Sequence, residues 1–479
     1  MRFRPAWMIT TLLLLGAVGS ARAQCPPGVG CTEYLGAARN GSYFRILVPD
    51  AWDGDVFLVN HGLTLDPLTI APHHTCMGAP ATACSVDADC AGAGTGVCNQ
   101  ISMLGFDQIV LPMGKAVAAS TFSQTSWAVF RSRADLKAIL KFLGRKGPGK
   151  PKRIIVTGMS GGGAVTVDAT MRLRAGKMIH GAIPLCSASA GGLPTVDAAT
   201  DVRLVYDFLC NDVPGGSFDS LPDVGNPEMT EIELGLIMNT CLGWLAPSAN
   251  PAVAAAQRAR LDAMYALTRI PPPNFNLAHV TGFSVLAMGQ VVADPKRLGG
   301  RRPGWNDEVD YTTVFAGSAA QAFNAAVPRF RRGPGRKKMA NNTRIDFTRG
   351  PAKRVNYPIL SFAGRGDHIT TPEFQKVYAD AAAYGGKDHA LVWGSTAGHC
   401  AYTPHELRAV VLEYLEWLDG YGTPAEDRPT TADVLARCLS LPGASPSVCN
   451  FDTAFTPGPL VARTPARADW PVPAKSPLP

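Results

Sequence analysis

Charge is scarce in this sequence. Only 17% of its 479 residues are charged, against 46% that are hydrophobic, and the formal net charge is +7. Little charge combined with abundant apolar residues excludes a chain that is disordered along its whole length. Basic residues gather at 301–302 and 329–338, but no nucleic-acid-binding motif accompanies them. We therefore expect a solvated face there and no nucleic-acid partner.

Beyond its N-terminus, the sequence lacks an apolar run of the ~20 residues that a membrane-spanning helix needs. The one marked run, residues 7–18, is shorter, follows two arginines and precedes the small-x-small sequence Ala21-Arg22-Ala23. This is the layout of a secretory signal peptide. We predict that residues 1–23 are removed, and that the mature protein is secreted or periplasmic, with no stable membrane anchor.

Metal-binding spacings are missing as well. None of the twelve cysteines forms the close C-x₂₋₄-C pair of a zinc site, and the acids of a calcium-binding loop are incomplete. We therefore expect no metal. Twelve cysteines behind a signal peptide predict disulfides instead. Cys25 and Cys31 are close enough to pair, as are Cys438 and Cys449. Four further cysteines permit three connectivities, which stay open: Cys76, Cys84, Cys90 and Cys98.

Short apolar runs alternate with amphipathic helices through most of the chain. Strands are expected at residues 43–48, 56–59, 116–119, 153–157, 181–185, 359–363 and 390–393. Helices are expected at residues 132–143, 163–173 and 404–418. Capping boxes are predicted from Ser132 to Asp135 and from Thr403 to Glu406. Apolar strands separated by helices indicate an α/β protein with a mostly parallel sheet covered on both faces.

This pattern is interrupted twice and ends before the C-terminus. Residues 64–105 hold the cysteine cluster and are interpreted as a disulfide-rich loop, and residues 201–350 as an inserted cap. The α/β core then comprises residues 24–200 and 351–422. A proline-rich C-terminal extension, residues 423–479, is expected to wrap over the surface.

A candidate nucleophile lies between an expected strand and an expected helix. Gly158-Met159-Ser160-Gly161-Gly162 matches G-x-S-x-G, and its position suits a sharp strand-to-helix turn. The flanking glycines remove side chains that would clash in such a turn, so the Ser160 hydroxyl stands clear. The helix N-terminus behind it favours developing negative charge. The pattern predicts a nucleophilic serine.

A serine needs a base, and the base needs an acid to orient it. Of nine histidines, His399 lies between the last expected strand and the last helix, where a loop can bring it over the sheet. Asp367 directly follows the strand at 359–363. Asp197 and Asp201 are rival acids. We predict a triad of Ser160, His399 and Asp367.

The tetrahedral oxyanion of acyl transfer requires backbone N–H donors. The first is expected to be the amide of Gly161, directly after the nucleophile. The second is expected in the loop after the strand at 56–59, from Gly62 or Leu63.

With this order of nucleophile, acid and base, the chain resembles the α/β-hydrolase superfamily over residues 42–200 and 355–420. The resemblance implies an α/β-hydrolase sandwich and hydrolysis of a small or polymeric ester without a cofactor, as in secreted bacterial polyester depolymerases and feruloyl-type esterases. In tannase-like members, a cysteine precedes the nucleophile and is bridged to one beside the histidine. Here Met159 precedes Ser160, so Cys400 pairs elsewhere, with Cys186 as one choice, or stays free.

Two other functions fit the same pattern. A serine peptidase of the prolyl-oligopeptidase type uses the same order of residues, although no propeller-like repeat precedes the catalytic part. A catalytically dead scaffold that only binds is the second alternative, but such a scaffold has no need to retain three triad residues. The sequence therefore favours a serine esterase.

Overall fold

The computed structural model describes most of the chain after the first 24 residues. The described ranges are 25–173, 178–268, 270, 274–315, 318–343, 357–385, 388–423 and 428–458. The predicted signal peptide, residues 1–23, lies outside them, as does the end of the C-terminal extension.

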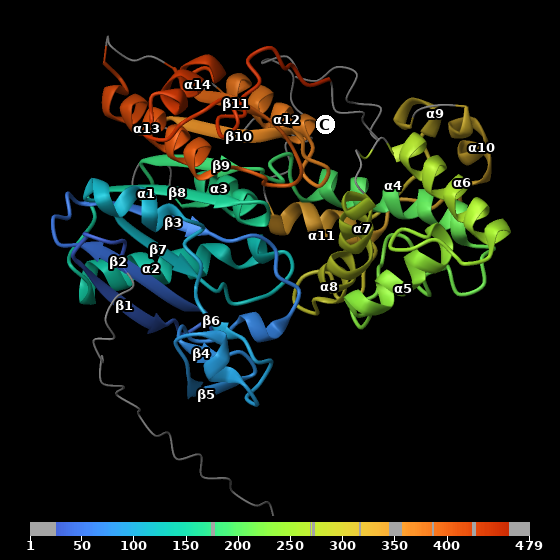
Figure 1. The fold of residues 1–479 in the computed structure, drawn as a ribbon, viewed down its shortest axis with the longest axis horizontal. Coiled ribbons are helices and arrows are strands. Elements are labelled where there is room, and N and C mark those ends of the chain that lie inside the picture. The colour runs from blue at the N-terminus through green and yellow to red at the C-terminus, as the bar shows by residue number, and fades with distance from the viewer. Residues whose placement is uncertain are drawn as a thin grey trace, which may run out of the picture.

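An eight-stranded sheet forms the centre of the molecule, in the order β1-β2-β7-β3-β8-β9-β10-β11 (Figure 1). Its strands are β1 Cys31–Ala37, β2 Tyr43–Pro49, β3 Asp55–Asn60, β7 Ala116–Ser120, β8 Arg153–Met159, β9 Gly181–Leu185, β10 Ile359–Gly366 and β11 His389–Ala397. Strand β2 is antiparallel to both of its neighbours, and all other pairings are parallel. The expected α/β architecture is confirmed, and β1 is an edge strand that the sequence pattern did not predict.

Helices cover both faces of this sheet. Alternate residues of each strand point to opposite sides, so each face carries apolar side chains that pack against helices. Val56 and Leu58 of β3 face one hydrophobic cluster, and Phe57 and Val59 face the other. The first cluster takes in α2 Ser132–Lys146, α3 Gly161–Arg172 and α12 Pro372–Tyr384. The second takes in α1 Phe106–Val110, α13 Pro404–Gly420 and α14 Thr431–Leu439.

A helical segment joins β9 to β10, and we call it the cap. Its elements are α4 Gly192–Cys210, α5 Glu231–Leu242, α6 Pro251–Thr268, α7 Asn274–Gly282, the π-helical η5 Phe283–Ala287, α8 Met288–Ala293, α9 Tyr311–Val314, α10 Ala319–Ala326 and α11 Pro334–Thr343. The cap has a hydrophobic cluster of its own, which includes Tyr206, Met238 and Trp305. Figure 1 shows it beside the carboxyl ends of the parallel strands, so it adjoins the edge where α/β sheets bind ligands.

One continuous helical stretch in the cap, Asn276–Ala293, has the length and the mean hydropathy (1.2) of a membrane crossing. Inside the protein, however, 72% of this stretch is buried. Core helices of water-soluble proteins pass the same test of length and hydropathy, so the stretch is weak evidence for a membrane span.

All twelve cysteines are paired. The bridges are Cys25–Cys31, Cys76–Cys90, Cys84–Cys98, Cys186–Cys400, Cys210–Cys241 and Cys438–Cys449. Two of them hold residues 64–105, where a small sheet forms from β4 Thr75–Cys76, β5 Ala79–Ala83 and β6 Cys98–Asn99. Short 3₁₀ turns occur at η1 Pro67–Thr69, η2 Asp87–Cys90, η3 Leu111–Met113 and η4 Ala128–Phe130. Six disulfides are typical of an extracellular or periplasmic protein.

Two local predictions need correction. Helix α2 is not capped by Ser132, whose hydroxyl donates to the Val129 carbonyl, while the carboxylate of Asp135 accepts from Asn40 and Ser123 instead. These longer-range partners outcompete the local capping box. The C-terminal extension contains a regular helix, α14, with a capping box from Thr430 to Asp433, in a segment that was expected only to wrap the surface. The box predicted at Thr403 is present.

Candidate active site

Ser160 lies on a strained turn between β8 and α3. Its φ of 57° and ψ of −120° are unfavourable for a residue with a side chain. Two glycines make the turn possible. A Cβ at Gly158 would lie 2.5 Å from the Asn60 carbonyl oxygen, and one at Gly162 would lie 2.0 Å from the same atom. The backbone of β3 therefore passes too close for any larger residue at either position.

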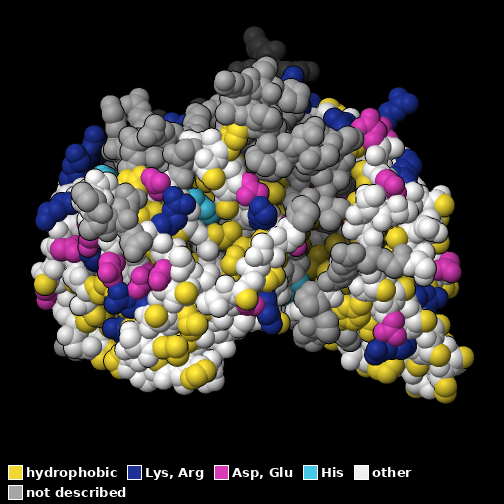
Figure 2. Space-filling view, turned by 90° about the horizontal axis from the view of Figure 1, so that it is seen from above, with side chains coloured by type: hydrophobic (Ala, Val, Ile, Leu, Met, Phe, Trp, Pro, Cys, Tyr) yellow, Lys and Arg dark blue, Asp and Glu magenta, His cyan; other side chains and the backbone are white. Residues whose placement is uncertain are grey.

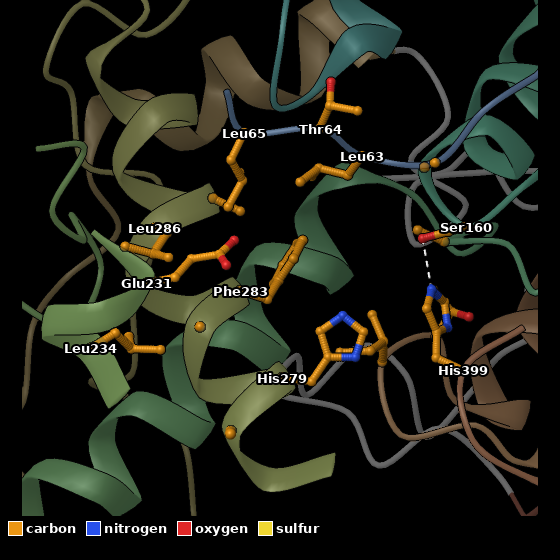
Figure 3. Close-up of a pocket in the computed structure, with 18 of the residues that line it drawn as sticks. Leu63, Thr64, Leu65, Ser160, Glu231, Leu234, His279, Phe283, Leu286 and His399 are labelled. Atoms are coloured by element: carbon orange, nitrogen blue, oxygen red, sulfur yellow. Dashed lines mark hydrogen bonds between the residues drawn. The ribbon is translucent and has the colours of Figure 1, made fainter. Parts of the chain in front are cut away.

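Side chains from three loops meet at this turn. His399, after β11, places Nε2 2.7 Å from the Ser160 hydroxyl oxygen (Figure 3). Its Nδ1 lies 2.9 Å from both carboxylate oxygens of Asp367, which follows β10. The structure thus brings together the three residues that the sequence pointed to. Because the acid accepts from Nδ1–H, Nε2 carries the lone pair that faces the serine.

Asp367 is oriented by its own loop. The residue is 3% exposed, and its carboxylate accepts hydrogen bonds from the amides of Ile369 and Thr370, and from the Thr370 hydroxyl. The rival acid Asp197 is committed elsewhere, because both of its carboxylate oxygens accept from the guanidinium of Arg336 at 2.6 and 2.9 Å.

The His399 loop is tied to the sheet by a disulfide. Cys400, the next residue, is bridged to Cys186 at the end of β9. The carbonyl of Cys186 accepts from the Thr370 hydroxyl, which also contacts Asp367. The bridge and this hydrogen bond together connect the loops that carry His399 and Asp367. The sequence had left the partner of Cys400 open.

The predicted oxyanion donors lie around Ser160. An added Cβ on Gly62 would stand 3.9 Å from the serine hydroxyl oxygen, and one on Gly161 would stand 3.1 Å from the Leu63 amide nitrogen. The Gly161 amide is the first in α3, and such amides have no partner within their own helix. His61 fixes the other loop, since its Nδ1 donates to the Gly62 carbonyl at 2.8 Å. Both backbone segments thus approach Ser160.

No protein-family model and no curated protein sequence matches the chain. Among solved structures, an esterase from Pyrococcus furiosus matches 81% of this chain and 90% of its own, with 12% identity and a TM-score of 0.36. The esterase LipA from Xanthomonas oryzae matches 77% of this chain and 85% of its own, with 11% identity and a TM-score of 0.34. An acylaminoacyl peptidase from Pyrococcus horikoshii matches 85% of this chain but only 44% of its own, with 10% identity and a TM-score of 0.37. The chain therefore spans less than half of that protein.

The strand order, the strained serine turn and the chain order of serine, acid and histidine are this chain's own features. The chain has the α/β-hydrolase fold. In this fold the nucleophile stands at the carboxyl edge of the sheet, where its hydroxyl is open to a substrate.

A cavity of about 750 Å³ opens in front of Ser160, between the core and the cap. Its wall away from the triad is largely apolar and includes Leu65, Leu234, Phe283 and Leu286 (Figure 3). Seen from above, hydrophobic side chains lie in the recess between the two parts of the molecule (Figure 2). The cavity is large enough for a drug-sized ligand.

Two histidines beside the triad were not singled out from the sequence. His279 on α7 lines the cavity, and its ring centre lies 5.8 Å from that of His399. Its Nδ1 is 3.3 Å from Nε2 of His368, which is buried directly after Asp367. Burial lowers the pKa of His368 to about 4. Loss of water around the ring, together with nearby His399, lowers the pKa of His279. Both rings are therefore neutral at neutral pH.

Two groups of side chains in the described part of the chain have the spacing of metal ligands. The cysteine group, Cys76, Cys84 and Cys90, is committed to disulfides. The second group contains Glu33, His73 and His74. Nδ1 of His73 accepts from the Ile101 amide, so Nε2 of the neutral ring carries a proton and offers no lone pair to a metal. Neither group is suited to hold an ion.

Proposed function

We propose that the protein is a serine hydrolase that cleaves carboxylic esters, with Ser160 as nucleophile, His399 as base and Asp367 as orienting acid. The observation that carries the proposal is the unbroken chain of contacts from acid to base to serine, at 2.9 and 2.7 Å, on the strained turn. Such a chain activates a hydroxyl that is unreactive at neutral pH.

In the proposed reaction, the Ser160 oxygen attacks the ester carbonyl while His399 Nε2 takes the hydroxyl proton. The tetrahedral oxyanion is held by the amides of Gly161 and of Gly62 or Leu63. The C–O bond of the ester then breaks, and His399 returns its proton to the leaving alcohol. Water attacks the acyl-enzyme by the same route and releases the acid. Every proton passes through His399, so no cofactor is needed.

The cavity supports an ester with an apolar acyl group. Its aliphatic and aromatic wall, formed by Leu65, Leu234, Phe283 and Leu286, offers apolar area but no hydrogen-bond ladder for an extended peptide backbone. Burial of apolar surface contributes about 25 cal/mol per Å², so a longer acyl chain binds better until it fills the cavity.

Peptide cleavage is the second candidate, and one observation favours it. The carboxylates of Asp66 and Glu231 line the same cavity, where they could hold the amino group of a peptide. Aminoacyl p-nitroanilides test this directly. Turnover of these compounds above that of matched esters would replace the esterase proposal with a peptidase.

The cysteines also bear on the cellular compartment in which the protein works. The disulfide pairing of all twelve cysteines fits an oxidising compartment. We propose that residues 1–23 are a signal peptide and that the protein is secreted or periplasmic. We also propose that the core of residues 24–200 and 351–422 supplies the chemistry. Residues 201–350, which hold the cap apart from the first half of α4, supply most of the substrate wall, and residues 423–479 are an extension. N-terminal sequencing of exported protein tests the cleavage site.

The experiment for the activity is hydrolysis of p-nitrophenyl esters of increasing acyl length. Wild type is compared with Ser160→Ala and with Ser445→Ala, a matched control on an exposed serine. We expect Ser160→Ala to lose about a thousandfold or more in kcat, with unchanged melting temperature, while the control keeps full activity. No hydrolysis by folded wild type would favour the binding scaffold or the peptidase.

A further inference from the structure

His279 is the one histidine that the cap contributes to the lining of the catalytic cavity, among the residues that the structure describes. Its side chain lies between the apolar wall and His399, and one nitrogen of its ring is turned towards the cavity (Figure 3). The ring is also edge-on to His368, with centres 5.4 Å apart. It is thus placed to touch a substrate bound at Ser160.

The contact with His368 indicates which nitrogen of His279 carries the proton. Nδ1 of His279 and Nε2 of His368 lie 3.3 Å apart, so one of the two donates to the other. Nδ1 of His368 is buried and has no partner within the described residues. A buried N–H without an acceptor is costlier and rarer than a bare lone pair, so the proton of His368 belongs on Nε2. His279 Nδ1 then accepts, and its Nε2 carries hydrogen.

The position beside His399 indicates which part of a substrate His279 meets. His399 protonates the leaving alcohol, so the alcohol portion of the ester lies on its side of the cavity. The oxyanion lies on the other side, against the loops of Gly161 and Leu63. A donor next to His399 therefore faces the alcohol portion and not the carbonyl oxygen.

We propose that His279 is a specificity-determining residue, whose Nε2–H donates a hydrogen bond to a second oxygen in the alcohol portion of the ester. The preferred substrates are then esters of oxygenated alcohols, such as ether alcohols, diols or the hydroxyacyl units of an oligoester, over esters of plain alkyl alcohols. This inference rests on the proposed esterase function and assigns the alcohol half of its substrate.

The test uses two esters of equal size, 2-methoxyethyl butyrate and n-butyl butyrate, each rate being normalised to alkaline hydrolysis of the same ester. A single neutral hydrogen bond is equivalent to about three- to tenfold in rate. We expect wild type to prefer the methoxyethyl ester in kcat/KM by that factor. His279→Leu should abolish the preference, whereas His279→Gln, which retains an N–H donor, should keep part of it. His405→Gln, on the outer helix α13, is the matched histidine control and should change neither rate.

The outcomes separate this inference from the esterase proposal. Equal normalised rates for the two esters in wild type, or a preference that survives in His279→Leu, would overturn the role of His279 while leaving the esterase intact. Absence of Ser160-dependent hydrolysis of both esters would overturn both proposals. A melting temperature near that of wild type in His279→Leu shows that its loss of preference is not a loss of fold, and His279→Gln gives the same test with the donor retained.

Discussion

The two sides of the catalytic cavity are built in different ways. On the core side, Ser160, Asp367 and His399 each follow a strand of one sheet. The disulfide Cys186–Cys400 ties the His399 loop to the end of β9, and the Cys186 carbonyl accepts from Thr370 in the Asp367 loop. On the cap side, most lining residues stand on helices, and the bridge Cys210–Cys241 joins two cap helices, α4 and α5, to each other. If the proposed function holds, we expect the core to keep the reacting atoms in place and the cap to determine which substrate reaches them.

The largest effect that separates the two sides is expected for Asp367→Asn. An amide in place of the carboxylate favours the wrong tautomer of His399, so we expect kcat to fall by about 10³–10⁴. Asp197→Asn is the control, because it breaks the ion pair with Arg336 of α11 and not a contact with the triad. The control should lower the melting temperature with little change in kcat. The reverse result would identify Asp197 as the working acid.

Removal of one disulfide on each side gives the next largest contrast. Cys186→Ser with Cys400→Ser should lower kcat by about ten- to a hundredfold, because a shift of ~1 Å in the base is that costly. Cys210→Ser with Cys241→Ser should destabilise the cap and change substrate preference, while kcat on a short ester is retained. Each pair is also expected to cost about 2–4 kcal/mol of unfolding free energy. Kinetics with a short and a long p-nitrophenyl ester separate the effects, and equal losses of kcat would contradict the contrast.

A smaller effect is expected at the apolar wall. Phe283→Ala enlarges the cavity, so the preferred acyl chain should lengthen, and kcat/KM for a short ester should fall by about tenfold. The measurement is kcat/KM along a series of acyl lengths. Phe455→Ala is the control, on an aromatic ring that packs edge-on against Trp393, away from the cavity. An unchanged optimum would exclude the wall from acyl recognition.

The smallest effect concerns pH. His368 and His73 are buried, and burial lowers their pKa values to about 4 and about 3, from 6.5 in the unfolded chain. The unfolded state therefore binds more protons below pH 6.5, so stability is full above that value and falls as pH drops towards the folded pKa values. At the folded-state pKa values, each histidine should have lowered the free energy of unfolding by on the order of 1–3 kcal/mol. Urea unfolding at pH 7.5 and at pH 5 measures this loss of stability. The loss should be smaller in His73→Asn, and an equal loss in that variant would contradict the assignment.

Local patterns predicted the core much better than the cap. The strands and the serine turn can be recognised in the sequence, because a buried strand needs a short apolar run and the turn needs glycine at positions 158 and 162. No motif marks His279, which lies on a cap helix whose placement depends on packing between distant segments. The edge strand β1 was missed because its residues are only partly buried and do not form an apolar run.

Two disulfides between cysteines close in sequence were predicted, and the one between the most distant cysteines was left open. Cys25–Cys31 and Cys438–Cys449 are separated by 6 and 11 residues, so proximity in sequence indicated them. Cys186–Cys400 spans 214 residues, and only the folded sheet brings its two ends together. The same holds for the hydrogen bond that Asn40 donates to the Asp135 carboxylate, which displaced the predicted helix cap. Contacts that are distant in sequence decided the features that local patterns did not predict.

A fluorophosphonate probe shows directly whether Ser160 is a nucleophile activated by His399. Wild type, His399→Ala and Asp197→Asn are treated at pH 7.5, and the labelled peptide is identified by mass spectrometry. We predict one label per chain, on Ser160, at similar rates in wild type and Asp197→Asn, and labelling of His399→Ala slower by about a thousandfold. A label on another residue, or a folded wild type that takes no label, would contradict it.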